Sequence, residues 1–118
     1  MGAIVHMTVK NSLKMADALV PNRISDEIKQ RWLGDLEGMV QVELRGRSTD
    51  EAESLTEEGI MPTNGTLGVP YPFDRMYWLY LVAMIEYTNG DAARYANAAS
   101  MFNAVYASYA KWLVRGGN

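Results

Sequence analysis

Hydrophobic residues recur at intervals of three and four positions in four stretches of this chain, with polar residues between them. This spacing places apolar side chains on one face of an α-helix. The first stretch covers residues 9–20, where Val9, Leu13 and Ala16 follow Thr8, and threonine often caps the start of a helix. The second covers residues 26–45 and follows Ser25, another capping residue. Both stretches therefore predict amphipathic helices.

The 26–45 helix is expected to have distinct apolar and polar faces. Its apolar face is predicted at Ile28, Trp32, Leu36, Met39 and Val40, continuing to Leu44, and its polar face at Lys29, Asp35, Glu37 and Gln41. Gly34 and Gly38 lie on one side of this helix, so a neighbouring helix is expected to approach closely there.

Two further helices are predicted in the second half of the chain. One runs over residues 74–89 with Asp74 as its cap, and the other over residues 92–115 with Asp91 as its cap. The short Asn89-Gly90-Asp91 junction favours an antiparallel helical hairpin. The last helix has an aromatic face for the core and a second side that is small or polar throughout, comprising Ala93, Asn97, Ser100, Ala104, Ala107 and Lys111.

The segment 46–73, hereafter the connecting segment, has a different character. It holds three of the four prolines and a run of acidic residues over 50–58 without one basic residue. Asn64-Gly65, flanked by apolar residues, is typical of a hairpin turn. We expect a long extended loop whose apolar second half is exposed and available to a partner.

The predicted fold is all-α, a single domain over residues 1–118 with about four helices and residues 1–7 as a disordered arm. Five residues are expected to be buried together in its core, namely Trp32, Leu36, Leu81, Phe102 and Tyr106.

Composition removes many classes of function. The 118 residues include no cysteine and one histidine, His6, so thiolate chemistry and histidine-rich metal sites are excluded. A net charge of -3 argues against a sequence-independent nucleic-acid binder. The longest apolar run, residues 77–85, is short of the ~20 residues of a membrane span, and we expect no membrane association.

Candidate catalytic groups have simpler structural explanations. The acidic run does not match an EF-hand loop and is expected to be a solvated loop. Asp74 and Asp91 are explained as helix caps, and Glu86 is expected to pair with Arg94. The aromatic residues of the last helix follow a core pattern rather than a stacking platform. We therefore expect no enzyme activity, no metal and no cofactor.

Several segments resemble a known family. They are residues 69–77 (VPYPFDRMY), 80–87 (YLVAMIEY), 89–91 (NGD), 94–95 (RY), 100–103 (SMFN), 109–112 (YAKW), 16–22 (ADALVPN) and 29–33 (KQRWL), together with Tyr106. Together they resemble the head-tail connector, or head-completion adaptor, proteins of tailed phages and prophages of Gram-positive bacteria. The resemblance covers most of residues 8–113.

This resemblance implies a helical structural protein of the virion, assembled in the host cytoplasm. Such an adaptor forms a homo-oligomeric ring under the portal protein, completes the DNA-filled head and presents a surface to the tail-side connector protein. DNA would pass through its channel without specific contacts.

The residues also suggest where partners would bind. The candidate partner or oligomer interface comprises Ile60, Met61, Leu67, Val69, Tyr71, Asn97, Ser100, Ala104 and Lys111. The alternative is a small helical protein-binding or regulatory module, monomeric or dimeric, with no viral structural role.

Overall fold

The computed structural model of the chain describes residues 6–117. Within them the elements are β1 (His6–Thr8), α1 (Val9–Leu19), α2 (Asp26–Met39), the π-helix η1 (Val40–Leu44), α3 (Thr49–Glu53), β2 (Thr66–Pro70), the 3₁₀ turn η2 (Phe73–Arg75), α4 (Met76–Thr88) and α5 (Ala92–Val114).

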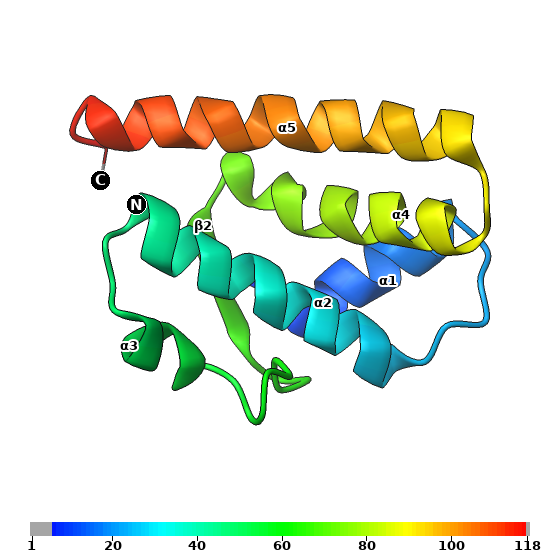
Figure 1. The fold of residues 1–118 in the computed structure, drawn as a ribbon, viewed down its shortest axis with the longest axis horizontal. Coiled ribbons are helices and arrows are strands. Elements are labelled where there is room, and N and C mark those ends of the chain that lie inside the picture. Colours follow the sequence, from blue (N-terminus) through cyan, green and yellow to red (C-terminus); the bar gives the residue numbers. More distant parts are fainter. Residues whose placement is uncertain (1–5, 118) are drawn as a thin grey trace.

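Helix α4 is the central element of the molecule. It packs against α5 on one side and against α1 and α2 on the other, and α4 and α5 form an antiparallel hairpin (Figure 1). Buried residues occur at seven of its positions and on most of its sides. A helix that is apolar nearly all round belongs in the interior. Helix α5 forms the outer layer and buries only one side.

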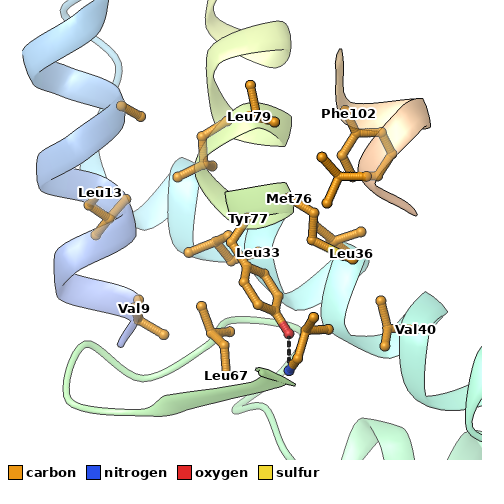
Figure 2. Packing of buried hydrophobic residues seen from close by; sticks show 14 of the residues in the cluster. Val9, Leu13, Leu33, Leu36, Val40, Leu67, Met76, Tyr77, Leu79 and Phe102 are labelled. Carbon is orange, nitrogen blue, oxygen red and sulfur yellow. Dashed lines mark hydrogen bonds between the residues drawn. The ribbon is translucent and has the colours of Figure 1, made fainter. Parts of the chain in front are cut away.

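One hydrophobic cluster joins α1, α2, β2, α4 and α5 (Figure 2). Of the expected core, Leu36, Leu81 and Phe102 are buried, whereas Trp32 and Tyr106 are only partly buried. The largest fully buried side chains include Leu36 and, beyond the expected set, Tyr77, Tyr109, Leu33, Leu67 and Met76.

The capping predictions are confirmed at three of four helices. Thr8, Ser25 and Asp91 each accept a hydrogen bond from a backbone N–H in the first turn that follows. The fourth prediction, Asp74 as a cap, is wrong, because α4 begins at Met76, after the 3₁₀ turn, and has no side-chain cap.

Asp74 lies in the 3₁₀ turn instead. Burial raises the pKa of its carboxyl, although the backbone N–H groups of Asp74 and Arg75 act in the opposite direction.

The fold is mostly helical but not purely so. A fifth helix, α3, and a small antiparallel sheet are present in residues 6–117. His6 pairs with Pro70 and Thr8 with Thr66, so His6 and Met7 belong to a strand rather than to a disordered arm. The rest of the predicted arm, residues 1–5, lies outside the described residues. Strand β1 pairs with β2, which gives the backbone of both strands hydrogen-bond partners.

The connecting segment is not one extended loop. It holds α3, with a capping box between Ser48 and Glu51, then a turn in which Gly65 N–H donates to the Pro62 carbonyl, and finally β2. The expected hairpin around Asn64-Gly65 is wrong in its pairing, since β2 pairs with β1 rather than with residues 60–61.

The expected faces of the second helix are correct only in part. Leu36 and Val40, predicted as core, are buried, and Asp35, predicted as polar, is exposed. Ile28 and Met39, predicted as core, are exposed, whereas Lys29, Glu37 and Gln41, predicted as the polar face, are buried. Asp17 supplies a polar partner for Lys29, and Gly68 and Tyr77 supply partners for Glu37. Gly34 meets the connecting segment and not another helix: a Cβ there would lie 2.2 Å from the Gly59 carbonyl oxygen.

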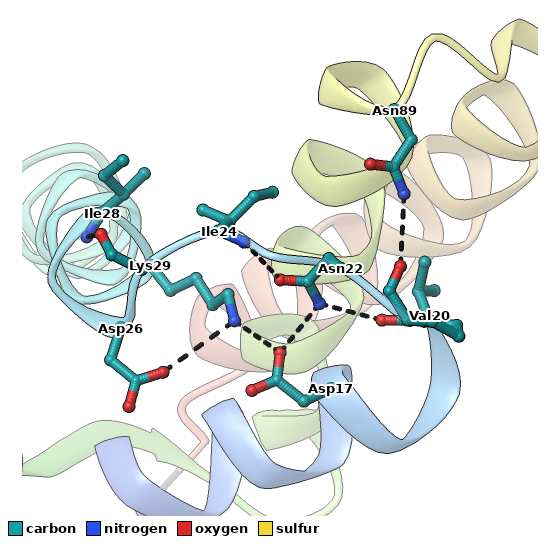
Figure 3. Close-up of polar contacts among 10 residues, drawn as sticks. Asp17, Val20, Asn22, Ile24, Asp26, Ile28, Lys29 and Asn89 are labelled. Atoms are coloured by element: carbon teal, nitrogen blue, oxygen red, sulfur yellow. Dashed lines mark hydrogen bonds and ion pairs between the residues drawn. The ribbon is translucent and has the colours of Figure 1, made fainter.

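Lys29 shows how a buried charge is accommodated (Figure 3). Only 2% of the residue is exposed, and its Nζ lies 2.6 Å from Asp17 Oδ1 on α1 and 3.9 Å from Asp26 Oδ1. The Asn22 side chain also donates to Asp17 Oδ1, at 3.0 Å. A paired and hydrogen-bonded charge of this kind holds α1 against α2.

Candidate functional site

Helix α5 presents one long exposed side, which we call the outer stripe. It comprises Asn97, Ser100, Met101, Ala104, Ser108 and Lys111, all exposed. Another side of the helix carries Ala98, Phe102, Val105 and Tyr109, which are buried against the rest of the protein. The division follows the 3.6-residue period of the helix.

Four of the nine sequence-predicted interface residues lie together on this outer stripe. Asn97, Ser100, Ala104 and Lys111 follow one another along α5 at three-, four- and seven-residue steps, and all are exposed. Small side chains at such positions let another helix approach closely.

A groove adjoins the N-terminal part of the outer stripe. It has a volume of about 400 Å³ and lies between the end of α1, α4 and α5. Its walls include Leu19, Trp78, Val82 and Met101, and more than half of the surface of Leu19 and of Met101 is exposed. Clustered exposed apolar side chains are typical of protein-binding surfaces.

The other five predicted interface residues, in the connecting segment, do not form an exposed patch. Met61, Leu67 and Val69 are buried in the protein's own core, and Ile60 is partly buried. Tyr71 is 80% exposed, unlike the other four. The expectation of an exposed apolar second half is therefore wrong for residues 61–69.

Polar contacts from α2 hold the connecting segment in place. The Gln30 side chain donates to the Met61 carbonyl at 2.8 Å, and Gln30 and Met61 also share a backbone hydrogen bond. Arg31 donates to the Glu58 carbonyl at 3.3 Å. These contacts give the segment partners within its own chain.

A further attachment is a buried arrangement that we call the clasp, formed by Glu37, Gly68, Val69 and Tyr77. Glu37 Oε2 accepts the Gly68 N–H at 2.7 Å, and Glu37 Oε1 accepts the Tyr77 hydroxyl at 2.5 Å. The Tyr77 hydroxyl in turn accepts the Val69 N–H at 2.8 Å, the bond drawn in Figure 2. Burial and the nearby Glu37 carboxylate raise the pKa of Tyr77, so the hydroxyl keeps its proton and donates it to Glu37.

Gly68 fits this geometry because it carries no side chain. A Cβ at that position would lie 2.9 Å from Gln41 Nε2 and 3.0 Å from Glu37 Oε2. The absence of a side chain allows the strand backbone to approach the carboxylate. Nothing in the local sequence around Gly68 indicates this role, because its partner lies 31 positions away.

No metal centre is found in the part of the chain that the structure describes. No three histidine or acidic side chains among residues 6–117 gather closely enough to hold a metal ion.

The predicted pair between Glu86 and Arg94 is wrong, because Arg94 pairs with Asp91 at 3.5 Å. Glu86 is buried and lines the groove together with Arg94.

Within residues 6–117, no helix combines the length and apolar character of a membrane span.

Comparisons with protein-family models, with curated proteins and with solved structures find no match to this chain.

Proposed function

We propose that this protein is a structural adaptor of the phage head-tail connector type, which assembles with copies of itself in a ring under a portal protein and completes the head for tail attachment. The observation that carries the proposal is the outer stripe of α5. A ring subunit needs one helical side for its own core and another for its neighbours, and α5 has a buried aromatic side and an exposed small, polar side.

The sequence resemblance supports the same assignment. Its densest part, residues 69–112, forms β2 and the α4–α5 hairpin. Many of these residues pack the hairpin in the structure: Phe73 contacts the rings of Tyr109 and Trp112, and Phe102 contacts those of Tyr80 and Tyr106. The resemblance thus concerns residues that position the outer stripe.

A second candidate is a monomeric or dimeric protein-binding module with no viral role. The groove between α1, α4 and α5 favours it, because Leu19 and Met101 present apolar surface that a partner's side chain would cover. The two candidates differ in stoichiometry and in the need for a portal protein.

The test is electron microscopy and native mass spectrometry of the chain mixed with the portal protein encoded in the same genome. The adaptor proposal predicts a ring of chains on one end of the portal oligomer. Ala104→Arg, in the outer stripe, should abolish the ring, whereas Ala18→Arg, at an exposed position of α1, should leave it intact. A genome without a portal gene, or a chain that stays monomeric or dimeric beside the portal, would contradict the proposal.

A further inference from the structure

A second pocket lies on another part of the molecule, between α2 and η1 on one side and β1, β2 and the connecting segment on the other. Its volume is about 430 Å³, and its lining includes His6, Glu37, Gln41, Arg47 and Gly68. It takes no residue from α5, so a ligand bound in it would be separate from the adaptor function and would not depend on it.

One polar atom of this pocket, the Gln41 side-chain oxygen Oε1, lacks a hydrogen-bond partner. Gln41 is only 5% exposed, and its Oε1 accepts no hydrogen bond from residues 6–117. Its Nε2 reaches Glu37 Oε2 at 3.5 Å, a long contact. A buried carbonyl oxygen without a donor costs free energy, so an occupant that supplies a donor would be favoured. Gln41 also belongs to a π-helix, a rare element that often occurs at functional sites.

Two other groups of the lining add to this hydrogen-bond acceptor character. His6 Nδ1 is buried and has no partner among the described residues, and it accepts a hydrogen bond when the ring is neutral with its proton on Nε2. Glu37 is buried, and within residues 6–117 no lysine or arginine nitrogen lies within 4.0 Å of its carboxylate. The clasp satisfies Glu37 with hydrogen bonds but brings no positive charge to it.

The chemistry that fits these groups is a positively charged nitrogen with several N–H donors. An ammonium has three donors and a guanidinium five, and neither has an acceptor that would be repelled by Gln41 Oε1 or Glu37. The pocket is larger than one amino group needs, and Leu55, Met61 and Leu67 supply apolar walls for an aliphatic stem. We propose that this pocket binds the side chain of a lysine or arginine presented by a partner protein.

Substitution of Arg47 tests whether the bound ligand is a cation or an anion. Arg47 lines the pocket and its side chain is exposed, so it opposes a bound cation weakly and would favour a bound anion. Arg47→Gln should therefore tighten cation binding by about twofold to fivefold, the range expected for one exposed charge interaction. The substitution is at the surface and should not affect folding.

The experiment is an NMR titration of the full chain, labelled with ¹⁵N, with Nα-acetyl-lysine methylamide and Nα-acetyl-arginine methylamide. Saturable shifts of the Gly68 amide and the Gln41 side-chain amide are expected, with no such shifts for the neutral Nα-acetyl-norleucine methylamide. Gln41→Met should remove the response. The proposal is overturned if no probe shifts these signals, if the norleucine probe shifts them equally, or if acetate binds instead and loses affinity in Arg47→Gln.

Discussion

Tyr77 on α4 donates its hydroxyl hydrogen to Glu37 Oε1 on α2 across 2.5 Å, although 40 positions separate the two residues and both are buried. Glu37 and Tyr77 also receive the adjacent backbone N–H groups of Gly68 and Val69. One pair of side chains thereby joins two helices and a strand. This contact explains why Leu67 and Val69 of β2 lie in the core and not on the surface.

Tyr77→Phe tests the clasp. Phenylalanine fills the same space but leaves Glu37 Oε1 and the Val69 N–H without their partner. Each such buried group costs about 1–3 kcal/mol, so we expect the free energy of unfolding to fall by about 2–4 kcal/mol. Chemical denaturation measures this change. The control is Tyr87→Phe, because Tyr87 is 69% exposed, and its effect should stay within about 0.5 kcal/mol. Equal effects of the two substitutions would show that the clasp is not a stabilising contact.

Gly34 and Gly38 on α2 provide a matched pair. A Cβ at Gly34 would overlap the Gly59 carbonyl oxygen, whereas a Cβ at Gly38 would meet nothing within 4 Å. Gly38→Ala should raise the free energy of unfolding by about 0.5–1 kcal/mol through helix propensity. Gly34→Ala should lower it by about 1–3 kcal/mol, because the backbone of the connecting segment must move. Thermal or denaturant unfolding of both variants measures the two free energies. If Gly34→Ala stabilises the protein, the connecting segment does not pack against Gly34.

The contact between Asp17 and Lys29 predicts a pH dependence. Burial disfavours the ionised carboxylate, but the hydrogen bonds from Lys29 and Asn22 outweigh it, and the pKa of Asp17 lies below its ordinary value of 3.8. The folded state therefore takes up this proton less readily than the unfolded state. The resulting stabilisation is present at neutral pH and is lost as the pH falls below about 4, through the folded pKa.

Asp17→Asn should remove that contribution. We expect a loss of about 1–2 kcal/mol at pH 7, less than for a fully buried pair because Asp17 is partly exposed. The difference between the wild type and the variant should shrink as the pH is lowered. Asp26→Asn is the control, since Asp26 is more exposed and lies farther from Lys29, and it should change little. A difference between wild type and Asp17→Asn that does not vary with pH would contradict the assignment.

Phe102 tests the packing of α5 on α4. Its ring contacts Tyr80 and Tyr106, and the residue is buried. Phe102→Ala should cost about 3–5 kcal/mol in the isolated chain, as large-to-small substitutions in cores do. The neighbouring Met101→Ala, on the outer stripe, should cost well under 1 kcal/mol. Similar losses in the two variants would mean that the buried side of α5 is misassigned.

Helix starts could be predicted from the sequence because the relevant interactions are local. Thr8, Ser25 and Asp91 bond to the backbone three residues ahead, so capping residues before apolar repeats identified them. The two sides of α5 were predictable in part for the same reason: Phe102 and Tyr109 are buried and the small residues of the outer stripe are exposed, although Tyr106 is only partly buried and Tyr95, also on the predicted aromatic face, is exposed.

The faces of α2 could not be predicted in this way. Periodicity assigns Lys29, Glu37 and Gln41 to solvent because they are polar, yet Asp17, Gly68 and Tyr77 provide partners that make burial of Lys29 and Glu37 tolerable. The β1–β2 pair was missed because β1 has three residues and its partner lies in another part of the chain. In both cases the deciding contact is distant in sequence.

Hydroxyl-radical footprinting of the methionines, read by mass spectrometry, tests the central claim that the outer stripe of α5 is the assembly surface and that Met61 of the connecting segment belongs to the core. Methionine oxidation reports side-chain exposure, and Met101, Met15 and Met61 are 57%, 44% and 3% exposed in the free chain. On binding to the portal oligomer, oxidation of Met101 should fall, that of Met15 on α1 should stay the same, and that of Met61 should be low throughout. Undiminished oxidation of Met101 in the complex, or oxidation of Met61 in the free chain equal to that of Met15, would contradict the claim.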